Sequence, residues 1–200
     1  IPAAILEQNS IPGFTNRILG HVVDSVFASY ESSRGFFPAR KFVLAGNPLR
    51  RRIVDVAERG EGFANRDPDR TPRFLRILVM GGSQGSHALN SVIPDAIARV
   101  GGGVVVRHQT GERDLAGVQA AYRERGVSAE VVSFIEDTAT AYVWADVVLA
   151  RAGATTLAEI AAIGRPAVLI PLPTAANDHQ TKNAEALAAA GAVVVVPQAE

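Results

Sequence analysis

The chain has 200 residues, 48% of them hydrophobic, and its 20 basic and 20 acidic residues balance. This length suits one domain, or one domain and part of another, and the balance gives the whole chain no bias toward nucleic acid. The absence of cysteine excludes disulfide frameworks, thiolate metal sites and cysteine nucleophiles. The longest apolar run, residues 186–196, is too short to span a bilayer, which takes about 20 residues.

Charge is less even along the chain than its total suggests. Basic residues outnumber acidic ones between residues 34 and 76, and such an interval can meet a phosphate or a membrane surface; a solvated connection explains the same composition. No signal peptide is visible. The chain begins with Ile1 rather than methionine and its first residues already have the pattern of a strand, so we expect a piece of a longer protein.

The first part of the chain combines short apolar runs with turn signals. Gly46-Asn47-Pro48 is a strong turn signal, and the polar, proline-containing residues 60–73 are the best candidate for a flexible connection. We therefore place a domain boundary near Arg50. The elements expected here are strands at residues 3–6, 24–29 and 41–45, a loop at residues 32–35, and helices at residues 15–23 and 50–59.

From residue 75 onward, short apolar runs alternate regularly with helical stretches. Strands separated by helices require right-handed parallel crossovers, and this predicts an α/β fold with a Rossmann-like parallel sheet. The expected strands are residues 75–80, 104–107, 129–133, 146–150, 167–170 and 193–196. The expected helices are residues 85–99, 112–125 and 138–142, one between Gly153 and Pro166, and one that begins near Asn177.

A glycine-rich turn at residues 81–86 (GGSQGS) joins the first of these strands to its helix. Glycines let a ligand approach the backbone, and a helix amino terminus favours an anion; Ser83 adds a hydroxyl donor. The turn is neither a P-loop nor a G-x-G-x-x-G fingerprint, and many strand-to-helix turns contain glycine only in order to turn. Its position at the first strand of the domain favours phosphate binding.

Residues 151–183 carry the densest cluster of polar side chains in an apolar neighbourhood. The cluster follows two successive strands, and ligands of open α/β sheets bind outside the carboxyl ends of strands. We therefore expect a ligand site here, and we expect two of the threonines to cap the intervening helix. The polar residues are Thr155, Thr156, Glu159, Asn177, Asp178, His179, Gln180 and Asn183.

Glu159 and His108 each have two interpretations. The carboxylate of Glu159 could accept hydrogen bonds from both hydroxyls of a ribose, but Thr156 and Glu159 also have the spacing of a capping box, in which the glutamate reaches back to the helix start. His108, at the end of a strand, fits a structural histidine as well as a site residue. The spacing alone leaves both choices open.

Other polar residues have simpler interpretations beside the functional ones. Asp178 and His179 do not make a metal site by themselves, and helix capping by Asn177 or Asp178 is the simpler use. Asn9 follows the first strand, where it could touch a ligand across a cleft or close a turn. Arg50 follows the Gly-Asn-Pro turn and could pair with a pyrophosphate or with a surface acid.

Several short motifs of this chain, none of them specific alone, become informative when their order along the chain is considered. They are Glu7-Gln8-Asn9, Gly46-Asn47-Pro48-Leu49-Arg50, GGSQGSHALN at residues 81–90, His108-Gln109-Thr110-Gly111, Phe134-Ile135, RAGATTLAE at residues 151–159, and Asp178-His179-Gln180 with Asn183. In this order the chain closely resembles the MurG family of UDP-N-acetylglucosamine (UDP-GlcNAc) transferases, in glycosyltransferase family 28, over nearly its whole length. The combination is very specific, although no single motif is.

The resemblance implies a GT-B fold, in which two Rossmann-like domains hold the active site in the cleft between them. Residues 1–50 would be the end of the N-terminal, acceptor-side domain, and residues 51–200 most of the C-terminal, UDP-sugar-binding domain. It implies an inverting transfer of GlcNAc from UDP-GlcNAc to the C4 hydroxyl of the MurNAc of lipid I, forming lipid II in peptidoglycan synthesis. It implies no bound metal and no cofactor, and a lipid acceptor implies a peripheral position on the cytoplasmic side of the cell membrane.

The resemblance also assigns roles to individual residues, and it favours ribose binding by Glu159 over the capping box. The implied substrate-binding residues are Asn9 and Arg50 for the donor from the cleft, Ser83 for the pyrophosphate, Ile135 for uracil through its backbone, Ala154, Thr155, Thr156, Leu157, Ala158 and Glu159 for the nucleotide, and Gln180 for the sugar.

The chain also departs from the family pattern. The family's glycine-rich first loop with its histidine, and the expected catalytic base, would lie upstream of residue 1, and the final helices would lie beyond Glu200. Leu6 stands where the family often has histidine. We therefore expect the 200-residue chain alone to bind UDP-sugar weakly and not to catalyse transfer.

Three other functions stay open on the sequence. Another GT-B transferase, such as a glycolipid synthase that uses UDP-galactose, would share the nucleotide-binding half, because sugar choice rests on few contacts around residues 177–180. A UDP-sugar 2-epimerase would need acid/base carboxylates and histidines that the sequence does not place. A non-catalytic nucleotide-sugar-binding subunit would need a membrane-bound partner to supply the other half.

Overall fold

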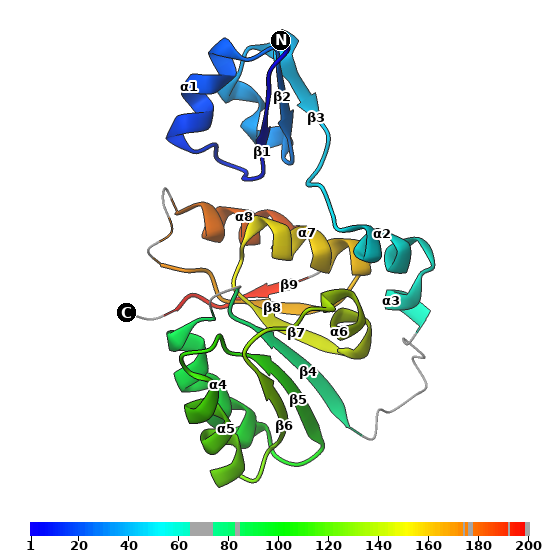
Figure 1. Cartoon of the computed structure of the whole chain (residues 1–200), viewed down its shortest axis with the longest axis vertical. Coiled ribbons are helices and arrows are strands. Elements are labelled where there is room, and N and C mark those ends of the chain that lie inside the picture. Colours follow the sequence, from blue (N-terminus) through cyan, green and yellow to red (C-terminus); the bar gives the residue numbers. More distant parts are fainter. Residues whose placement is uncertain (65–73, 83–84, 174, 176–177, 192, 199–200) are drawn as a thin grey trace.

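Two parallel sheets organise the chain in the computed structural model (Figure 1). The structure describes residues 1–64, 74–82, 85–173, 175, 178–191 and 193–198. Within these ranges one sheet has three strands and the other has six. Neighbouring strands run parallel in both sheets, which confirms the predicted α/β class with Rossmann-like parallel sheets.

The small sheet is built from the amino-terminal segment, in the strand order β1-β2-β3. Its elements are β1 (Ala4–Glu7), α1 (Phe14–Val22), β2 (Ser25–Ala28), the short 3-10 helices η1 (Glu31–Phe36) and η2 (Ala39–Lys41), and β3 (Phe42–Leu44). The 3-10 turns replace the loop that we expected between the second and third strands. They bring Phe37 into a small core with Val26 and Phe42, where the two phenyl rings stack with centroids 6.5 Å apart.

The large sheet has the strand order β6-β5-β4-β7-β8-β9. Its strands are β4 (Leu75–Met80), β5 (Val104–Gln109), β6 (Ser128–Val132), β7 (Val147–Ala150), β8 (Ala167–Leu169) and β9 (Val193–Val195). The chain builds outward from β4 to β6, returns to the middle of the sheet at β7, and builds outward again to β9. The neighbours β4 and β7 therefore mark the topological switch point, where doubly wound sheets bind their ligands.

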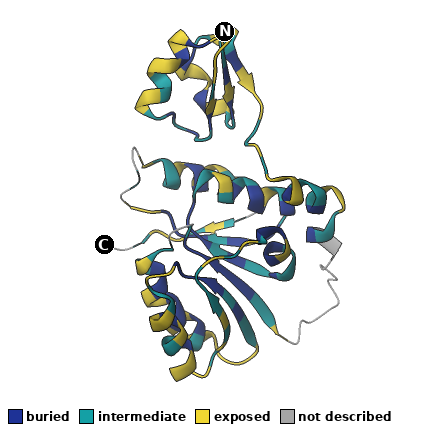
Figure 2. Cartoon of the chain, viewed as in Figure 1, coloured by how far each residue is buried: buried dark blue, intermediate teal, exposed yellow. Residues whose placement is uncertain are grey.

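Helices cover both faces of the large sheet (Figure 1). They are α2 (Arg51–Glu58), α3 (Glu61–Ala64), α4 (His87–Val100), α5 (Leu115–Glu124), α6 (Thr138–Trp144), α7 (Ala154–Ile163) and α8 (His179–Ala188). Apolar residues of α4 and α5 share one core with the sheet, and those of α2, α6, α7 and α8 share the other. The buried strands lie between these two layers (Figure 2).

Strand β4 shows why the sequence of this sheet is continuously apolar. Ile77 and Val79 pack into the core on the α4 side, while Leu78 and Met80 pack into the core on the α7 side. Successive side chains of a strand point to opposite faces of the sheet. A strand that is covered on both faces therefore needs apolar residues at every position rather than at every second one.

Several helix starts differ from the prediction. Helix α7 begins at Ala154 with Gly153 as its N-cap residue, and no side chain caps it; the predicted capping by Thr155 and Thr156 is wrong because the helix begins before them. Helices α4 and α5 also begin later than expected. Part of the predicted flexible connection, Glu61–Ala64, is helical, and residues 65–73 lie outside the described residues.

The loop after β1 joins the small sheet to the large one through amide groups. The backbone N–H of Ser10 donates to Asn183 Oδ1 at 2.8 Å, and Asn183 Nδ2 donates to Asn9 Oδ1 at 3.0 Å. Asn183 is fully buried on α8, so this contact is enclosed by protein. The division into two domains near Arg50 stays a prediction.

The turn after β4 offers a test of close backbone packing. Gly85 has φ of 75°, and a Cβ atom placed there would lie 1.8 Å from the carbonyl oxygen of Thr110. Gly82 has φ of 94° but meets nothing within 4 Å. Gly85→Ala should lower the free energy of unfolding by about 2–3 kcal/mol, and Gly82→Ala by only about 1 kcal/mol. Denaturant unfolding measures both, and equal losses would contradict the close approach.

Candidate functional site

The largest described cavity, about 660 Å³, opens at the carboxyl ends of β4 and β7. This is the switch point of the large sheet, where two diverging connections leave room for a ligand. The turn after β4 contributes Gly81, Gly82, Gly85 and Ser86 to its lining. Other lining residues come from the segment after β7, from the segment after β8 and from α8. With Gln198, which follows β9, the cavity thus collects residues from the segments after four strands of one sheet, β4, β7, β8 and β9.

The glycine turn presents its backbone to this cavity because side chains are sterically excluded. A Cβ atom at Gly81 would lie 2.5 Å from the backbone nitrogen of Ser86, and Gly85 cannot carry one for the reason given above. Helix α4 begins immediately afterwards at His87, so its first N–H groups face the same region. This arrangement favours an anionic ligand. Ser83, the predicted pyrophosphate residue, lies outside the described residues.

Gln109 fixes the turn to a second predicted contact. Its Nε2 donates to the carbonyl of Gly82 at 2.8 Å, and its Oε1 accepts from the backbone N–H of Ile135 at 2.9 Å. Ile135 lines a neighbouring cavity of about 260 Å³, whose other lining residues come from β5, β6, α6 and the segment that joins β6 to α6. Its predicted role in contacting uracil stays a prediction, and its N–H is already donated to Gln109. The sequence analysis did not identify Gln109 as a positioning residue.

Arg151 is a buried cation at the edge of the large cavity. It directly follows β7 and is only 8% exposed, yet within the described part of the chain no carboxylate lies within ion-pair distance of it. Burial lowers the pKa of its guanidinium from the ordinary value. The sequence analysis missed this residue as a candidate, although its place after a predicted central strand was a usable signal. A positive charge without a protein counter-ion suits an anionic ligand.

Glu159 is buried in a network of hydrogen bonds rather than in a helix cap. Its Oε1 accepts from Arg50 Nε at 3.1 Å and from Arg50 Nη2 at 2.7 Å, and its Oε2 accepts from the hydroxyl of Tyr142 at 3.1 Å. The capping-box interpretation is therefore wrong: α7 begins two positions before Thr156, and no side chain makes a cap hydrogen bond at its start. Burial, and then the charge of Glu159, raise the pKa of Tyr142.

This network bears on the predicted roles of Arg50 and Glu159. Arg50 precedes α2 and its side chain is about half exposed, while the side chain of Glu159 is 3% exposed. A ribose that used both oxygens of Glu159 would have to displace Arg50, which would then be available to an anionic group. The structure thus brings these two predicted site residues together, but as partners of each other.

The other predicted residues are distributed around α7 and α8. Thr156 and Gln180 line the large cavity, and Gln180 Oε1 also accepts from the backbone N–H of Leu172 at 3.0 Å. Thr155 is exposed. A cavity of about 280 Å³ between α7, α8 and the small sheet is lined by three predicted residues, Ala154, Leu157 and Ala158. Asn9 contacts Asn183 and not the large cavity.

The histidine and aspartate candidates have structural positions. His108 is fully buried; its Nε2 donates to Asn90 Oδ1 at 3.1 Å, so its Nδ1 accepts from the hydroxyl of Tyr122 at 3.1 Å. Asp178 is the N-cap residue of α8, but its side chain makes no cap hydrogen bond, because the backbone there is left-handed with φ of 54°; the predicted capping by its side chain is wrong. Asn177 lies outside the described residues. Within the described ranges, no cluster of three or more potential ligands could hold a metal ion.

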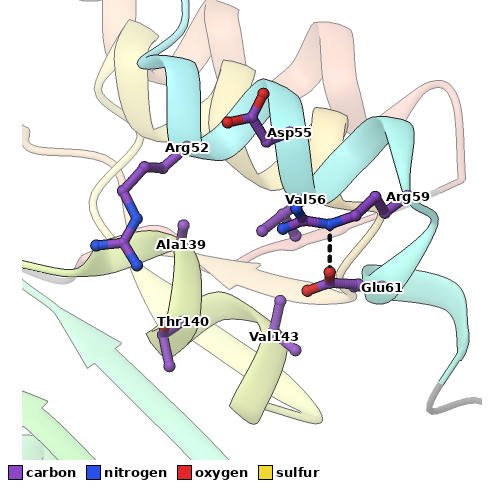
Figure 3. Close-up of a pocket in the computed structure, with 8 residues that line it drawn as sticks. All are labelled: Arg52, Asp55, Val56, Arg59, Glu61, Ala139, Thr140 and Val143. Carbon is purple, nitrogen blue, oxygen red and sulfur yellow. Dashed lines mark hydrogen bonds and ion pairs between the residues drawn. The ribbon is translucent and has the colours of Figure 1, made fainter.

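A second cavity, about 370 Å³, lies between α2, α3 and α6 (Figure 3). Its arginines are paired: Arg52 lies 2.8 Å from Asp137, and Arg59 lies 2.5 Å from Glu61. These carboxylates offset the positive charge, in contrast to the surroundings of Arg151. The cavity at the switch point is therefore the better candidate for an anionic ligand.

Comparison with known proteins identifies the family. Residues 76–200 match the glycosyltransferase family 28 C-terminal domain. The chain belongs to glycosyltransferase family 28. This confirms the family resemblance found in the sequence, and the matched region contains the whole cavity at the switch point.

Curated family 28 relatives share about half of their length with this chain. Two of them carry the name UDP-N-acetylglucosamine--N-acetylmuramyl-(pentapeptide) pyrophosphoryl-undecaprenol N-acetylglucosamine transferase. The one from Geobacter sulfurreducens is 47% identical over 203 residues, which cover 100% of this chain and 54% of the relative. The one from Nitratidesulfovibrio vulgaris (Miyazaki F) is 49% identical over 207 residues, which cover 98% and 53%.

A solved family 28 structure supports the fold. The crystal structure of Acinetobacter baumannii MurG superposes with a TM-score of 0.77 and 36% sequence identity, covering 98% of this chain and 54% of that one. The described part of the chain therefore has the Rossmann-like α/β architecture of a GT-B enzyme.

The buried histidine predicts a pH dependence of stability. Burial lowers the pKa of His108 from 6.5 to about 4, so the folded chain resists a proton that the unfolded chain accepts. The stabilisation is complete above pH 6.5 and is lost as the pH falls toward 4, by up to about 3 kcal/mol. Denaturant unfolding at stepped pH should show this slope.

In His108→Gln, which has no titrating group at this position, the free energy of unfolding should fall less between pH 6.5 and pH 4, by the amount that His108 contributes. His21→Gln is the matched control, because His21 is exposed on α1 and should leave the slope unchanged. The same slope in His108→Gln and in the unaltered chain would show that other groups cause the acid sensitivity.

Proposed function

We propose that the protein to which this chain belongs is an inverting hexosyltransferase that moves GlcNAc from UDP-GlcNAc to the C4 hydroxyl of the MurNAc of lipid I, forming lipid II in peptidoglycan synthesis. The observation that carries the proposal is the cavity at the switch point, where a glycine turn and a buried guanidinium, with no carboxylate partner among the described residues, suit a diphosphate. The names of the relatives described above supply the sugar and the acceptor.

In this proposal the chain contributes donor binding and stabilisation of the leaving group. The acceptor hydroxyl gives its proton to a base, which is expected upstream of residue 1, and attacks C1 of the sugar; the bond from C1 to the diphosphate oxygen breaks, and UDP leaves with the added negative charge. Preorganised N–H groups and nearby positive charge stabilise such charge without reorganising. The glycine turn and Arg151 line the cavity and α4 begins beside it, which supports this task for them.

We further infer that UDP-GlcNAc and lipid I are the substrates and that the protein acts at the cytoplasmic surface of the cell membrane as a peripheral protein. The support for the location is the lipid tail of the proposed acceptor. No helix in the described part of the chain combines the length and the apolar character needed to cross a bilayer.

Transfer of labelled GlcNAc to lipid I in vesicles tests the proposed reaction. The protein should convert lipid I to a product of one added GlcNAc with UDP-GlcNAc, and should use UDP-galactose and UDP-GalNAc at least about tenfold less well. Efficient transfer from UDP-galactose to a glycolipid would indicate another GT-B transferase. Binding of UDP-GlcNAc without transfer to any acceptor would indicate a nucleotide-sugar-binding subunit.

A ribose role for Glu159 predicts a specific loss of affinity. Glu159→Gln keeps the shape of the side chain but removes the negative charge that a diol would use, so UDP-GlcNAc should bind about tenfold more weakly by calorimetry, or roughly 1.4 kcal/mol. A donor analogue without the two ribose hydroxyls should bind both forms equally. Glu185→Gln, on the exposed face of α8, is the matched control, and an equal loss with the analogue would remove the ribose role.

A further inference from the structure

The hydroxyl of Ser86 has an unusual hydrogen-bond environment for an N-cap serine. Ser86 is the N-cap residue of α4, but its side chain makes no cap hydrogen bond with the helix. Its Oγ instead accepts two hydrogen bonds from Arg151, from Nε at 3.1 Å and from Nη2 at 2.8 Å. Helix capping, the usual use of a serine at this position, therefore does not explain this side chain.

These two contacts determine what the hydroxyl can still do. A serine hydroxyl has two lone pairs and one proton. Arg151 occupies both lone pairs, so only the proton is left for a further interaction. Within the described residues Ser86 Oγ donates to no acceptor, and the residue lines the large cavity at the switch point.

Arg151 itself has no donor left for a ligand. Its Nε–H goes to Ser86; Nη1 donates to the carbonyls of Ile170 and Pro171, each at 3.1 Å; and Nη2 donates to Ser86 and to Gln198 Oε1 at 2.6 Å. The single N–H of Nε and both N–H groups of each Nη are thereby used. All of these acceptors are neutral, so the positive charge of Arg151 is not cancelled. This charge polarises the hydroxyl of Ser86, which lines the cavity.

We propose that the Ser86 hydroxyl, oriented and polarised by Arg151, is a hydrogen-bond donor to the diphosphate of the sugar nucleotide. A donor that is itself bonded to a cation gives a stronger hydrogen bond to an anion. Ser86 is then a specificity residue for the phosphate groups, and Arg151 is a positioning residue that does not touch the ligand. This inference rests on the proposed function, because it names the diphosphate as the occupant of the cavity.

Calorimetry with UDP and with uridine on the full-length protein tests the inference. Ser86→Ala should weaken UDP about tenfold and leave uridine, measured by competition, within about twofold, because only UDP carries the anion. Ser86→Thr keeps a hydroxyl and should retain UDP affinity within about threefold. Ser91→Ala is the matched control: this serine lies exposed one turn further along α4 and donates to the carbonyl of Ala88.

Arg151→Lys separates positioning from direct contact. Lysine keeps the charge but cannot hold Ser86 with two parallel N–H groups, so UDP affinity should fall about as far as in Ser86→Ala. Ser86→Ala removes the hydroxyl and Arg151→Lys removes its orientation, so both changes abolish the same hydrogen bond. The double variant should therefore lose no more UDP affinity than either single variant. Melting temperatures with and without UDP show whether each variant is folded at the temperature of the titration.

The outcomes distinguish this inference from the proposed function. Unchanged UDP affinity in Ser86→Ala would overturn the inference and leave UDP binding intact. Equal losses for UDP and uridine would also overturn it, because they indicate a structural role. A protein that binds inorganic diphosphate in a Ser86-dependent way but prefers ADP to UDP would overturn the nucleotide assignment and keep the role of Ser86. Independent, additive losses in the double variant would contradict positioning by Arg151.

Discussion

The carboxyl edge of the large sheet is held in shape by one buried guanidinium. Arg151 follows β7 and joins the start of α4, the end of β8 and the segment after β9 through neutral acceptors. Burying a charge costs free energy unless its hydrogen bonds are all made. Here they are made by backbone carbonyls, an amide and a hydroxyl, so the site keeps a net positive charge. In the strand order β6-β5-β4-β7-β8-β9, the connections after β4 and β7 diverge and leave the cavity beside which this charge lies.

Two side chains connect the cavity to the rest of the molecule in different ways. Gln109 joins the glycine turn to the segment at Ile135, so that these two connections are fixed relative to each other. Glu159 is held between Arg50 and Tyr142, outside the large cavity. The second arrangement must change before the carboxylate can accept hydrogen bonds from a ribose on both oxygens.

The fold was largely predictable because its signals are local and repeated. The apolar run of β4 and the glycines that follow it indicate a buried parallel strand and a tight turn, and both are present. The helix starts were less predictable: Thr155 and Thr156 looked like caps, but α7 begins directly at the turn before them. The candidate site was harder still. The partners of Glu159 and Arg151 come from distant parts of the sequence, and neither spacing nor propensity encodes such pairs.

The ion pair between Arg50 and Glu159 links the connection between the two sheets to the predicted ribose-binding carboxylate. Arg50 lies on the only described crossing from the small sheet to the large one, just before α2, so the pair tethers this crossing to α7. A ligand that donates hydrogen bonds to both oxygens of Glu159 must break the ion pair with Arg50. Thermodynamic linkage makes the effect reciprocal: any force that draws the small sheet away from α7 and strains the pair also makes the carboxylate more accessible. Ligand binding at the Glu159 carboxylate and release of this crossing would therefore be coupled through the salt bridge between Arg50 and Glu159.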